Sequence, residues 1–476
     1  MKKVLVRGGC SPFAEDSTPE LILAQNLIGN NSGNAVYLNS IFGLFQSNGV
    51  EAVPDHYRVE RGLVTDADFE RINEEYDAFI IPLADAFRNS FIPYLKGLTK
   101  AFKKITIPCV VVGVCLRTPF EPKITEEHKF DEAVKEFMAA VLERSEMVGI
   151  RGEITGRYLE HLGFVADRDF MVIGCPSVFT FGGDLTQKPL EISSDMKLSV
   201  NFNRGTVHDG MQFLLNQLKR FPRSQYVPQN KHDLELGYLG APVTLAADPS
   251  YPLTADHWLY RNDQVHMFLH PNTWMDSIAQ CDLSIGGRMH GNIVSVLAGT
   301  PAVFMPTDGR TRELCEYHCF PHVPMHSVNP DTTLEEVLEQ VDLGSQLRAH
   351  ADRLARYQSF LRKNGLPSEG SFARKPGLEK FEIHGINDVS REQLIARWVA
   401  YQKETVEAKK VSSDVRAGRE KARTEAQKTK VANLKNENKQ LKAENKQLSA
   451  ELKKCKRTLN RKSVKAVLKL ADGLAK

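Results

Sequence analysis

The stretch Leu283-Ser284-Ile285-Gly286-Gly287-Arg288-Met289-His290-Gly291-Asn292 decides the fold of this chain. A short apolar run predicts a buried strand over Leu283–Ile285, and the glycine pair that follows predicts a tight turn. Ile293–Ala298 has helical spacing of apolar residues, and Ala302–Met305 is a second short apolar run. A strand, a helix and a strand in this order form a βαβ unit, which predicts a parallel sheet.

The same alternation of short apolar runs and amphipathic segments extends over most of the 476 residues. Further strands are predicted at Lys3–Arg7, Ala78–Pro82, Cys109–Val114, Met147–Ile150, Phe170–Ile173, Leu198–Phe202, Val243–Ala246 and Val265–Leu269. Helices are predicted at Phe91–Phe102, Asp131–Ser145, Ile154–Leu162, Asp209–Lys219 and 333–363. Phe179–Asp195 lacks periodicity, so we place a linker there. The chain is therefore predicted to be an α/β protein with two Rossmann-like domains, 1–180 and 196–364.

The C-terminal part is predicted to be helical and elongated. Residues 365–430 are interpreted as a linker and a charged helical segment. Apolar or Asn residues then recur at spacings of three and four, at Val431, Leu434, Asn438, Leu441, Asn445, Leu448, Leu452, Cys455 and Leu459. This heptad, with Asn438 and Asn445 at position a, predicts a parallel coiled coil over 431–460 and hence a homodimer. The alternative is a single solvated helix, which has no need for Leu at every third or fourth position.

A basic amphipathic helix is predicted for 461–476. Within Ser463–Leu474, apolar residues at helical spacing are flanked by Lys462, Lys465 and Lys469. Such a helix either lies on an anionic membrane surface as a peripheral contact or packs on the coiled coil, and the sequence leaves both open.

The formal net charge of +3 is the sum of two unlike parts. Residues 403–476 hold 22 Lys and Arg against 9 Asp and Glu, a net charge of +13, which leaves −10 for residues 1–402. The tail has almost no aromatic residues on which bases could stack, so we expect no nucleic acid partner. No long uncharged apolar run occurs, and Gly8-Gly9 interrupts the start before a signal-peptide core forms. These features predict a cytoplasmic protein, with the tail at the inner face of the membrane as one location.

Arg288 and His290 stand at the carboxyl end of the predicted strand. A helix beginning near Asn292 would offer free backbone N–H groups to an anion. A guanidinium beside an imidazole suits a substrate that has a carboxylate or phosphate and a proton to move. On spacing alone, an equally good interpretation is a structural ion pair for Arg288 and a hydrogen-bonded buried histidine for His290.

Other motifs argue against several chemistries. Cys315, His318, Cys319 and His322 would share one helical face and suit zinc, but Pro321 interrupts the helix, so we predict ordinary packing and no metal. The sequence has no G-x-G-x-x-G, Walker, G-x-S-x-G or H-E-x-x-H motif.

The sequence resembles the polysaccharide pyruvyl transferase family over roughly residues 1–345. Four blocks carry the resemblance: Cys281–His290 with its Arg-x-His, Pro301–Met305 followed by Thr307-Asp308-Gly309-Arg310, Val148–Glu153 with Leu162-Gly163, and Gly29–Asn34 before a helix. The tail lies outside the resemblance.

The resemblance implies a glycosyltransferase-B-like pair of domains with the active site in the cleft. It implies transfer of pyruvate from phosphoenolpyruvate to a sugar of a cell-surface polysaccharide or its precursor, forming a ketal without a further cofactor. Arg151 and Arg288 would then hold the carboxylate and phosphate of the donor, and His290 would be the acid–base residue.

The chain departs from the family pattern in two of these blocks. Arg310 stands where the family often has Lys, with Arg312 nearby, and either could face the donor. Asn31, Asn34 and Asp308 are further candidates, although Asn34 stands where an acid is common. Two alternatives remain open: a nucleotide-sugar glycosyltransferase of the same architecture, and a non-catalytic assembly protein organised by the coiled coil.

Overall fold

The chain folds as two compact units, Met1–Lys410 and Val411–Lys476. The computed structural model describes residues 1–12, 18–369, 385–460, 462–463, 465–467 and 469. The first unit contains two parallel four-stranded sheets, one from each half of its sequence. The prediction of an α/β fold with parallel sheets is therefore confirmed.

The first sheet has the strand order β2-β1-β3-β5 and is built from residues 3–112. Its strands are β1 (Lys3–Val6), β2 (Glu51–Pro54), β3 (Ala78–Pro82) and β5 (Cys109–Val112), and two short pairs follow, β4 (Asp85–Phe87) with β6 (Cys115–Leu116) and β7 (Val148–Ile150) with β8 (Phe170–Val172). The helices of this half are α1 (Pro19–Gln25), α2 (Gly33–Ser47), α3 (Asp66–Glu75), α4 (Ile92–Phe102), α5 (Asp131–Leu142) and α6 (Glu153–His161). A parallel bridge from Val114 to Ile150 joins the β7–β8 pair to the end of β5.

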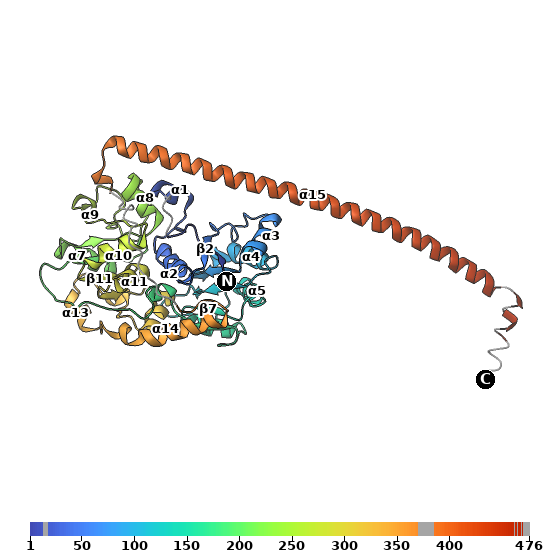
Figure 1. The fold of residues 1–476 in the computed structure, drawn as a ribbon, viewed down its shortest axis with the longest axis horizontal. Coiled ribbons are helices and arrows are strands. Elements are labelled where there is room, and N and C mark those ends of the chain that lie inside the picture. The colour runs from blue at the N-terminus through green and yellow to red at the C-terminus, as the bar shows by residue number, and fades with distance from the viewer. Residues whose placement is uncertain (13–17, 370–384, 461, 464, 468, 470–476) are drawn as a thin grey trace. The chain divides into compact units, whose positions relative to one another are not determined.

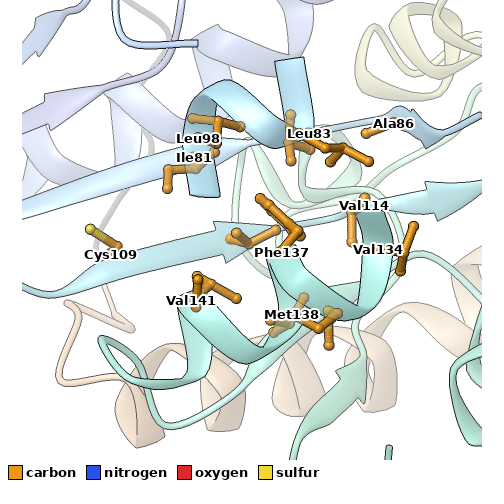
Figure 2. Close-up of a cluster of buried hydrophobic side chains, with 14 of the residues drawn as sticks. Ile81, Leu83, Ala86, Leu98, Cys109, Val114, Val134, Phe137, Met138 and Val141 are labelled. Carbon is orange, nitrogen blue, oxygen red and sulfur yellow. The ribbon is translucent and has the colours of Figure 1, made fainter. Parts of the chain in front are cut away.

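Apolar side chains on one face of α5 cover this sheet. Figure 2 shows Phe137 and Val141 of α5 next to the strand that carries Cys109, and Ile81 of β3 and Leu98 of α4 belong to the same cluster. In α5 the buried residues Val134, Phe137, Met138 and Val141 are spaced by three, one and three, which places them on one helical face. Burial of that face fixes α5 against the strands whose carboxyl ends enter the site described below.

The second sheet has the strand order β10-β9-β11-β12. Its strands are β9 (Leu198–Asn201), β10 (Gln225–Tyr226), β11 (Leu283–Gly286) and β12 (Ala302–Phe304). The helices of this half are α7 (His208–Arg220), α8 (Lys231–Leu239), α9 (Trp258–Arg261), α10 (Pro271–Ala279), α11 (Met289–Leu297), α12 (Gly309–His318), α13 (Leu334–Glu339) and α14 (Ser345–Lys363). The βαβ unit read from the sequence is thus β11, α11 and β12, with β11 and β12 paired in parallel.

The last helix of the second half packs on the first half. The helix predicted at 333–363 is two helices, and Tyr357, Phe360 and Leu361 of α14 lie in one buried cluster with Val4 and Ile80 of the first sheet. The second domain was predicted to extend over 196–364, and the last turns of α14 at its end pack on the first sheet.

Two predicted strands do not form. Val243–Ala246 is not a strand, and within Val265–Leu269 only Val265 pairs, in a single bridge to Tyr226. The neighbouring strand β10 has two residues, so it offers no ladder on which Val265–Leu269 could extend. Conversely, β2 was not predicted, because its residues are exposed or half-buried and lack a continuous apolar run.

Helix α15 (Arg391–Leu459) is continuous from the predicted linker into the predicted coiled coil (Figure 1). Its first turns belong to the first unit, where Trp398 donates a hydrogen bond to the Leu239 carbonyl (2.7 Å). Pairing with a second helix is not tested by a single chain. The predicted amphipathic helix at 461–476 falls mostly on residues outside those described. Among the described helices, none is long and apolar enough to cross a membrane.

Candidate active site

A cavity of about 480 Å³ lies between the two halves of the first unit. It is lined at the carboxyl ends of parallel strands from both sheets, by residues that include Arg7 after β1, Leu83 after β3 and Arg288 after β11. Ligands of parallel α/β folds bind at this end of the strands. A cavity between two α/β halves is also what the glycosyltransferase-B-like arrangement implies.

Two buried asparagines hold the turn after β11. The Cβ of any larger residue at Gly286 would lie 1.8 Å from the Asn201 carbonyl oxygen, and the φ of Gly286 is 147°, so this position requires glycine. The Asn201 side chain accepts a hydrogen bond from the Arg288 N–H (2.7 Å) and donates one to Asn292 (2.8 Å). Helix α11 follows directly, which places His290 in its first turn, three residues earlier than predicted.

Arg151, Arg288 and Arg310, the arginine cluster, bring three guanidinium groups to this cavity from both halves of the chain. Arg151 is 1% exposed, and its Nε donates to the Gly113 carbonyl (2.8 Å). Each arginine keeps one buried nitrogen without a hydrogen-bond partner among the described residues: Nη2 of Arg151, Nη2 of Arg288 and Nε of Arg310. Buried donors of this kind are normally satisfied, so their clustering indicates a site for an anionic ligand.

Acidic groups compensate this positive charge only in part. Arg310 pairs with Asp308 (3.2 Å), whereas Arg288 forms no ion pair with a described residue. Burial, and then the charge of Arg310, lowers the pKa of Arg288 below its usual value. A guanidinium stays charged at any physiological pH, so the uncompensated charge favours binding of an anion.

His290 lies inside the arginine cluster. Its ring stacks on Tyr37 with centroids 6.5 Å apart, and its Nε2 lies 3.9 Å from the Cys175 sulfur. Burial, and then the charges of the arginine cluster, lower the pKa of His290 well below its usual value. The free protein therefore holds His290 neutral, and neutralisation of the arginines by a bound anion would raise its pKa.

The two asparagines predicted in the first loop line the same cavity, but their side chains shape the loop. The Asn34 amide donates to the carbonyls of Ile28 (2.8 Å) and Gly29 (3.2 Å). The Asn31 side chain accepts a hydrogen bond from the Gly33 N–H (2.7 Å) at the start of α2. Both residues therefore position the backbone that borders the cavity.

Asp308 and Arg312 have structural partners. Asp308 is the N-cap of α12, where its carboxylate accepts the Thr311 N–H (2.9 Å) and also pairs with Arg310. Arg312 pairs with Glu316 (2.7 Å) and is not among the residues that line the cavity. Of the two arginines that the sequence offered at this turn, Arg310 faces the cavity.

Cys315, His318, Cys319 and His322 are not arranged to bind one metal ion. The helix ends at His318, Cys319 adopts a left-handed conformation (φ 52°), and His322 lies beyond the turn. His318 accepts the N–H of Cys175 (2.8 Å), which anchors the segment behind His290. No group of three or more potential metal ligands occurs among the described residues.

Two residues that the sequence analysis missed support the arginine cluster. The Arg151 guanidinium lies over the Tyr37 ring, 5.1 Å from its centroid. Glu313 of α12 accepts hydrogen bonds from the Thr155 N–H and hydroxyl, both at 2.8 Å. Burial raises the pKa of Glu313 to about 7, although these two hydrogen bonds act to lower it. In the sequence, Tyr37 cannot be distinguished from an ordinary apolar core residue of a helix. Glu313 could have been identified, because a charged residue among residues predicted to be buried indicates a special role.

Aromatic rings also line the cavity. Tyr57, Phe91 and Tyr94, the aromatic wall, line the cavity from the first half, and the rings of Phe91 and Tyr94 are 5.0 Å apart. Tyr94 is 36% exposed. Arg7 is neutralised by Glu60 at 2.5 Å. The guanidinium groups of Arg7 and Arg61 lie over the Tyr57 ring, and that of Arg88 lies over the Phe91 ring. Tyr94 therefore offers the most exposed aromatic ring of this wall.

Asp85 also lines the cavity and forms ion pairs with Arg88 (2.5 Å) and Arg117. Burial raises the pKa of Asp85, but the hydrogen bond from Arg117 and the charges of Arg310 and Arg88 outweigh it and hold the pKa below its usual value. Asp85 is therefore ionised and balances part of the positive charge of the cavity, whereas Arg288 has no ion-pair partner among the described residues.

The model of one protein family, described as polysaccharide pyruvyl transferase, matches residues 31–309, which is more than half of the chain. The matched region includes Arg151, Arg288 and His290. No curated protein matches the chain at a significant level.

Several solved structures are similar to the chain at low sequence identity. The MnaA–UDP complex from S. aureus has 11% identity and a TM-score of 0.40, covering 76% of this chain and 96% of that one. HepE of Anabaena in complex with UDP has 13% identity and a TM-score of 0.38, covering 76% and 99%. The calicheamicin glycosyltransferase CalG4 has 13% identity and a TM-score of 0.31, covering 77% and 96%. Likenesses at this level carry no information on substrate or mechanism.

Proposed function

The chain belongs to the polysaccharide pyruvyl transferase family, and we propose that it transfers the pyruvyl group of phosphoenolpyruvate to a sugar of a polysaccharide or its precursor. The observation that carries this proposal is the arginine cluster, in which three guanidiniums with unpaired buried nitrogens surround a neutral histidine. Phosphoenolpyruvate has a carboxylate and a phosphate on the same carbon atom, and planar guanidiniums bind both groups in a bidentate manner. Arg151, Arg288 and Arg310 are therefore assigned to the donor.

The reaction balances without a cofactor. A proton adds to the methylene carbon of phosphoenolpyruvate, and one sugar hydroxyl oxygen bonds to the central carbon. The bond from that carbon to the phosphate oxygen breaks, and inorganic phosphate leaves. A second hydroxyl of the same sugar then bonds to the central carbon and completes the ketal. Of the two protons that the hydroxyls release, one replaces the proton given to the methylene and the other leaves with phosphate.

His290 is assigned to the proton transfers. Its ring is neutral in the free protein because of burial and the arginine cluster. A bound donor neutralises that positive charge, so the ring takes up a proton that it can donate to the methylene carbon. The neutral ring formed by this step then accepts the proton of the attacking hydroxyl. Tyr37 and Cys175, which contact the ring, are positioning residues.

The acceptor sugar is assigned to the aromatic wall. The C–H faces of a sugar ring pack on aromatic faces, and Tyr94 exposes part of its ring at the cavity. Donor and acceptor would then bind side by side in one cavity, with the sugar hydroxyls directed toward His290.

Binding of phosphoenolpyruvate to the purified chain tests the donor assignment. We expect the donor to raise the unfolding temperature of the wild-type chain, and the Arg288→Gln variant to lose that shift. UDP is the matched control ligand, since a nucleotide-sugar glycosyltransferase would respond to UDP and not to phosphoenolpyruvate. Stabilisation by UDP alone would overturn the proposal.

Mass spectrometry of cellular glycans tests the product. Cells that express the chain should contain a surface glycan with an added pyruvyl mass, and cells that express His290→Ala should lack it. The reaction is proposed for the cytoplasm, as expected from the sequence. The other predicted partners, a second copy and a membrane surface, do not enter the reaction.

A further inference from the structure

Helix α15 exposes a continuous apolar stripe in the second unit. Val431, Leu434, Leu441, Leu448 and Leu452 are between 51% and 61% exposed. Their spacings of three, four and seven place them on one face of the helix. Apolar side chains repeated along one face of a long helix indicate a surface that is buried in an assembly.

The charges beside the stripe are arranged for pairing with an identical helix. With Val431 at position a, the acidic residues Glu437, Glu444 and Glu451 all occupy position g, and the lysines Lys435, Lys442 and Lys456 occupy position e. In a parallel pair, position g of one helix faces position e of the next heptad in the other helix. Glu437 then faces Lys442 of the second copy, and Glu451 faces Lys456 of the second copy.

An antiparallel pair would have the opposite electrostatics. It brings position g opposite g and position e opposite e, so glutamates would meet glutamates and lysines would meet lysines. It would also place Asn438 and Asn445 of position a against apolar residues of position d. In a parallel pair in register, each Asn faces its counterpart and can form a hydrogen bond with it.

We propose that residues 431–458 form a parallel, in-register, two-stranded coiled coil with a second copy of this chain. The partner that covers the stripe is a second copy of the same helix, because the acidic g residues of one copy face basic e residues of the other. The first unit of each copy (Met1–Lys410, the body) is therefore connected to the same end of one coiled coil. This inference is independent of the proposed reaction.

Cys455 provides a readout of the register. It occupies position d and is exposed in the single chain. In the parallel pair the two Cys455 side chains face each other across the core, within the range in which a disulfide can form. In an antiparallel pair of the same stripe, Cys455 at position d would oppose Val431 at position a of the second copy. The two Cys455 thiols would then lie roughly 36 Å apart, from a rise of about 1.5 Å per residue.

Sedimentation and oxidation of the full chain test the proposal. We expect a mass of twice 53.4 kDa at micromolar concentration. Added diamide should convert more than half of the chain to a covalent dimer that a reducing agent reverses. Cys455→Ser should form at least 10-fold less covalent dimer while it sediments as before. A monomer in sedimentation would overturn the proposal, and so would a dimer that Cys455 does not cross-link.

Charge reversal tests the pairing itself. The Glu437→Lys/Glu451→Lys and the Lys442→Glu/Lys456→Glu variants should each dimerise at least 10-fold more weakly, and a mixture of the two should dimerise as the wild type does. The control Lys439→Glu/Lys446→Glu changes the net charge equally at position b and should leave dimerisation unchanged. Unchanged dimerisation of both e and g variants would overturn the parallel pairing. Thermal unfolding of the body, expected to be unchanged in all variants, excludes misfolding as the cause.

Discussion

The body and the tail both carry positive charge, but they place it in opposite settings. In the body, the arginine cluster is buried or half-buried around a cavity and keeps donors without partners. In the tail, lysines are exposed, and so are the apolar residues of the stripe. We therefore assign a small anion to the buried donors of the body and a second helix to the exposed stripe of the tail. The net charge of +3 shows neither feature, because it sums an acidic body and a basic tail.

The largest expected effect is on proton transfer in the body. We expect His290→Ala to lower the turnover number by about 10²–10⁴-fold, because general acid–base catalysis contributes about that factor. Phosphate release from phosphoenolpyruvate in the presence of acceptor measures it. Binding of phosphoenolpyruvate should persist, since the arginine cluster is intact. Retained turnover would remove His290 from the reaction.

The next effect concerns the unpaired charge. Arg288→Gln should weaken donor binding roughly 10- to 100-fold, the equivalent of one or two hydrogen bonds to a charged group. Arg312→Gln is the matched control, because Arg312 pairs with Glu316 and does not line the cavity. Calorimetric titration with phosphoenolpyruvate compares the two. Equal losses in both variants would contradict the placement of the donor.

Features that depend on neighbouring residues in the sequence could be predicted, whereas features that depend on distant residues could not. Ala78–Pro82 was predicted with its observed bounds because all five residues are buried in a parallel sheet and form a continuous apolar run. Arg288 and His290 were predicted because the strand, the turn and the helix that position them are contiguous. Tyr37 was not, because its role comes from Arg151 and His290, which are distant in sequence.

The acceptor side should respond separately from the donor side. Tyr94→Ala should raise KM for the acceptor several-fold by removing the most exposed ring of the aromatic wall, with KM for phosphoenolpyruvate unchanged. Tyr76→Ala, outside the cavity lining, is the control. Steady-state kinetics with each substrate varied in turn separates the two constants. A change in KM for phosphoenolpyruvate alone would assign Tyr94 to the donor-binding part of the cavity.

Donor binding should be coupled to proton uptake. His290 is neutral in the free protein because burial and three positive charges lower its pKa. A bound anion offsets the part of that effect that comes from the three positive charges, so the pKa rises and we expect the site to take up a fraction of a proton, at most one, at neutral pH. Calorimetry in buffers of different ionisation enthalpy measures the number of protons. His290→Gln should bind without uptake, and uptake in that variant would assign the proton to another group.

The smallest effect on turnover is expected in the tail, and it is the sharpest test of the contrast. Leu441→Glu/Leu448→Glu places charges in the apolar stripe, so the full chain should sediment as a monomer. Turnover with a soluble acceptor should stay within about two-fold of the wild type, because every residue that lines the cavity lies between Arg7 and Arg310. A lost dimer together with lost turnover would show that the second copy completes the site. Dimerisation through the tail would then be a requirement for turnover in the body.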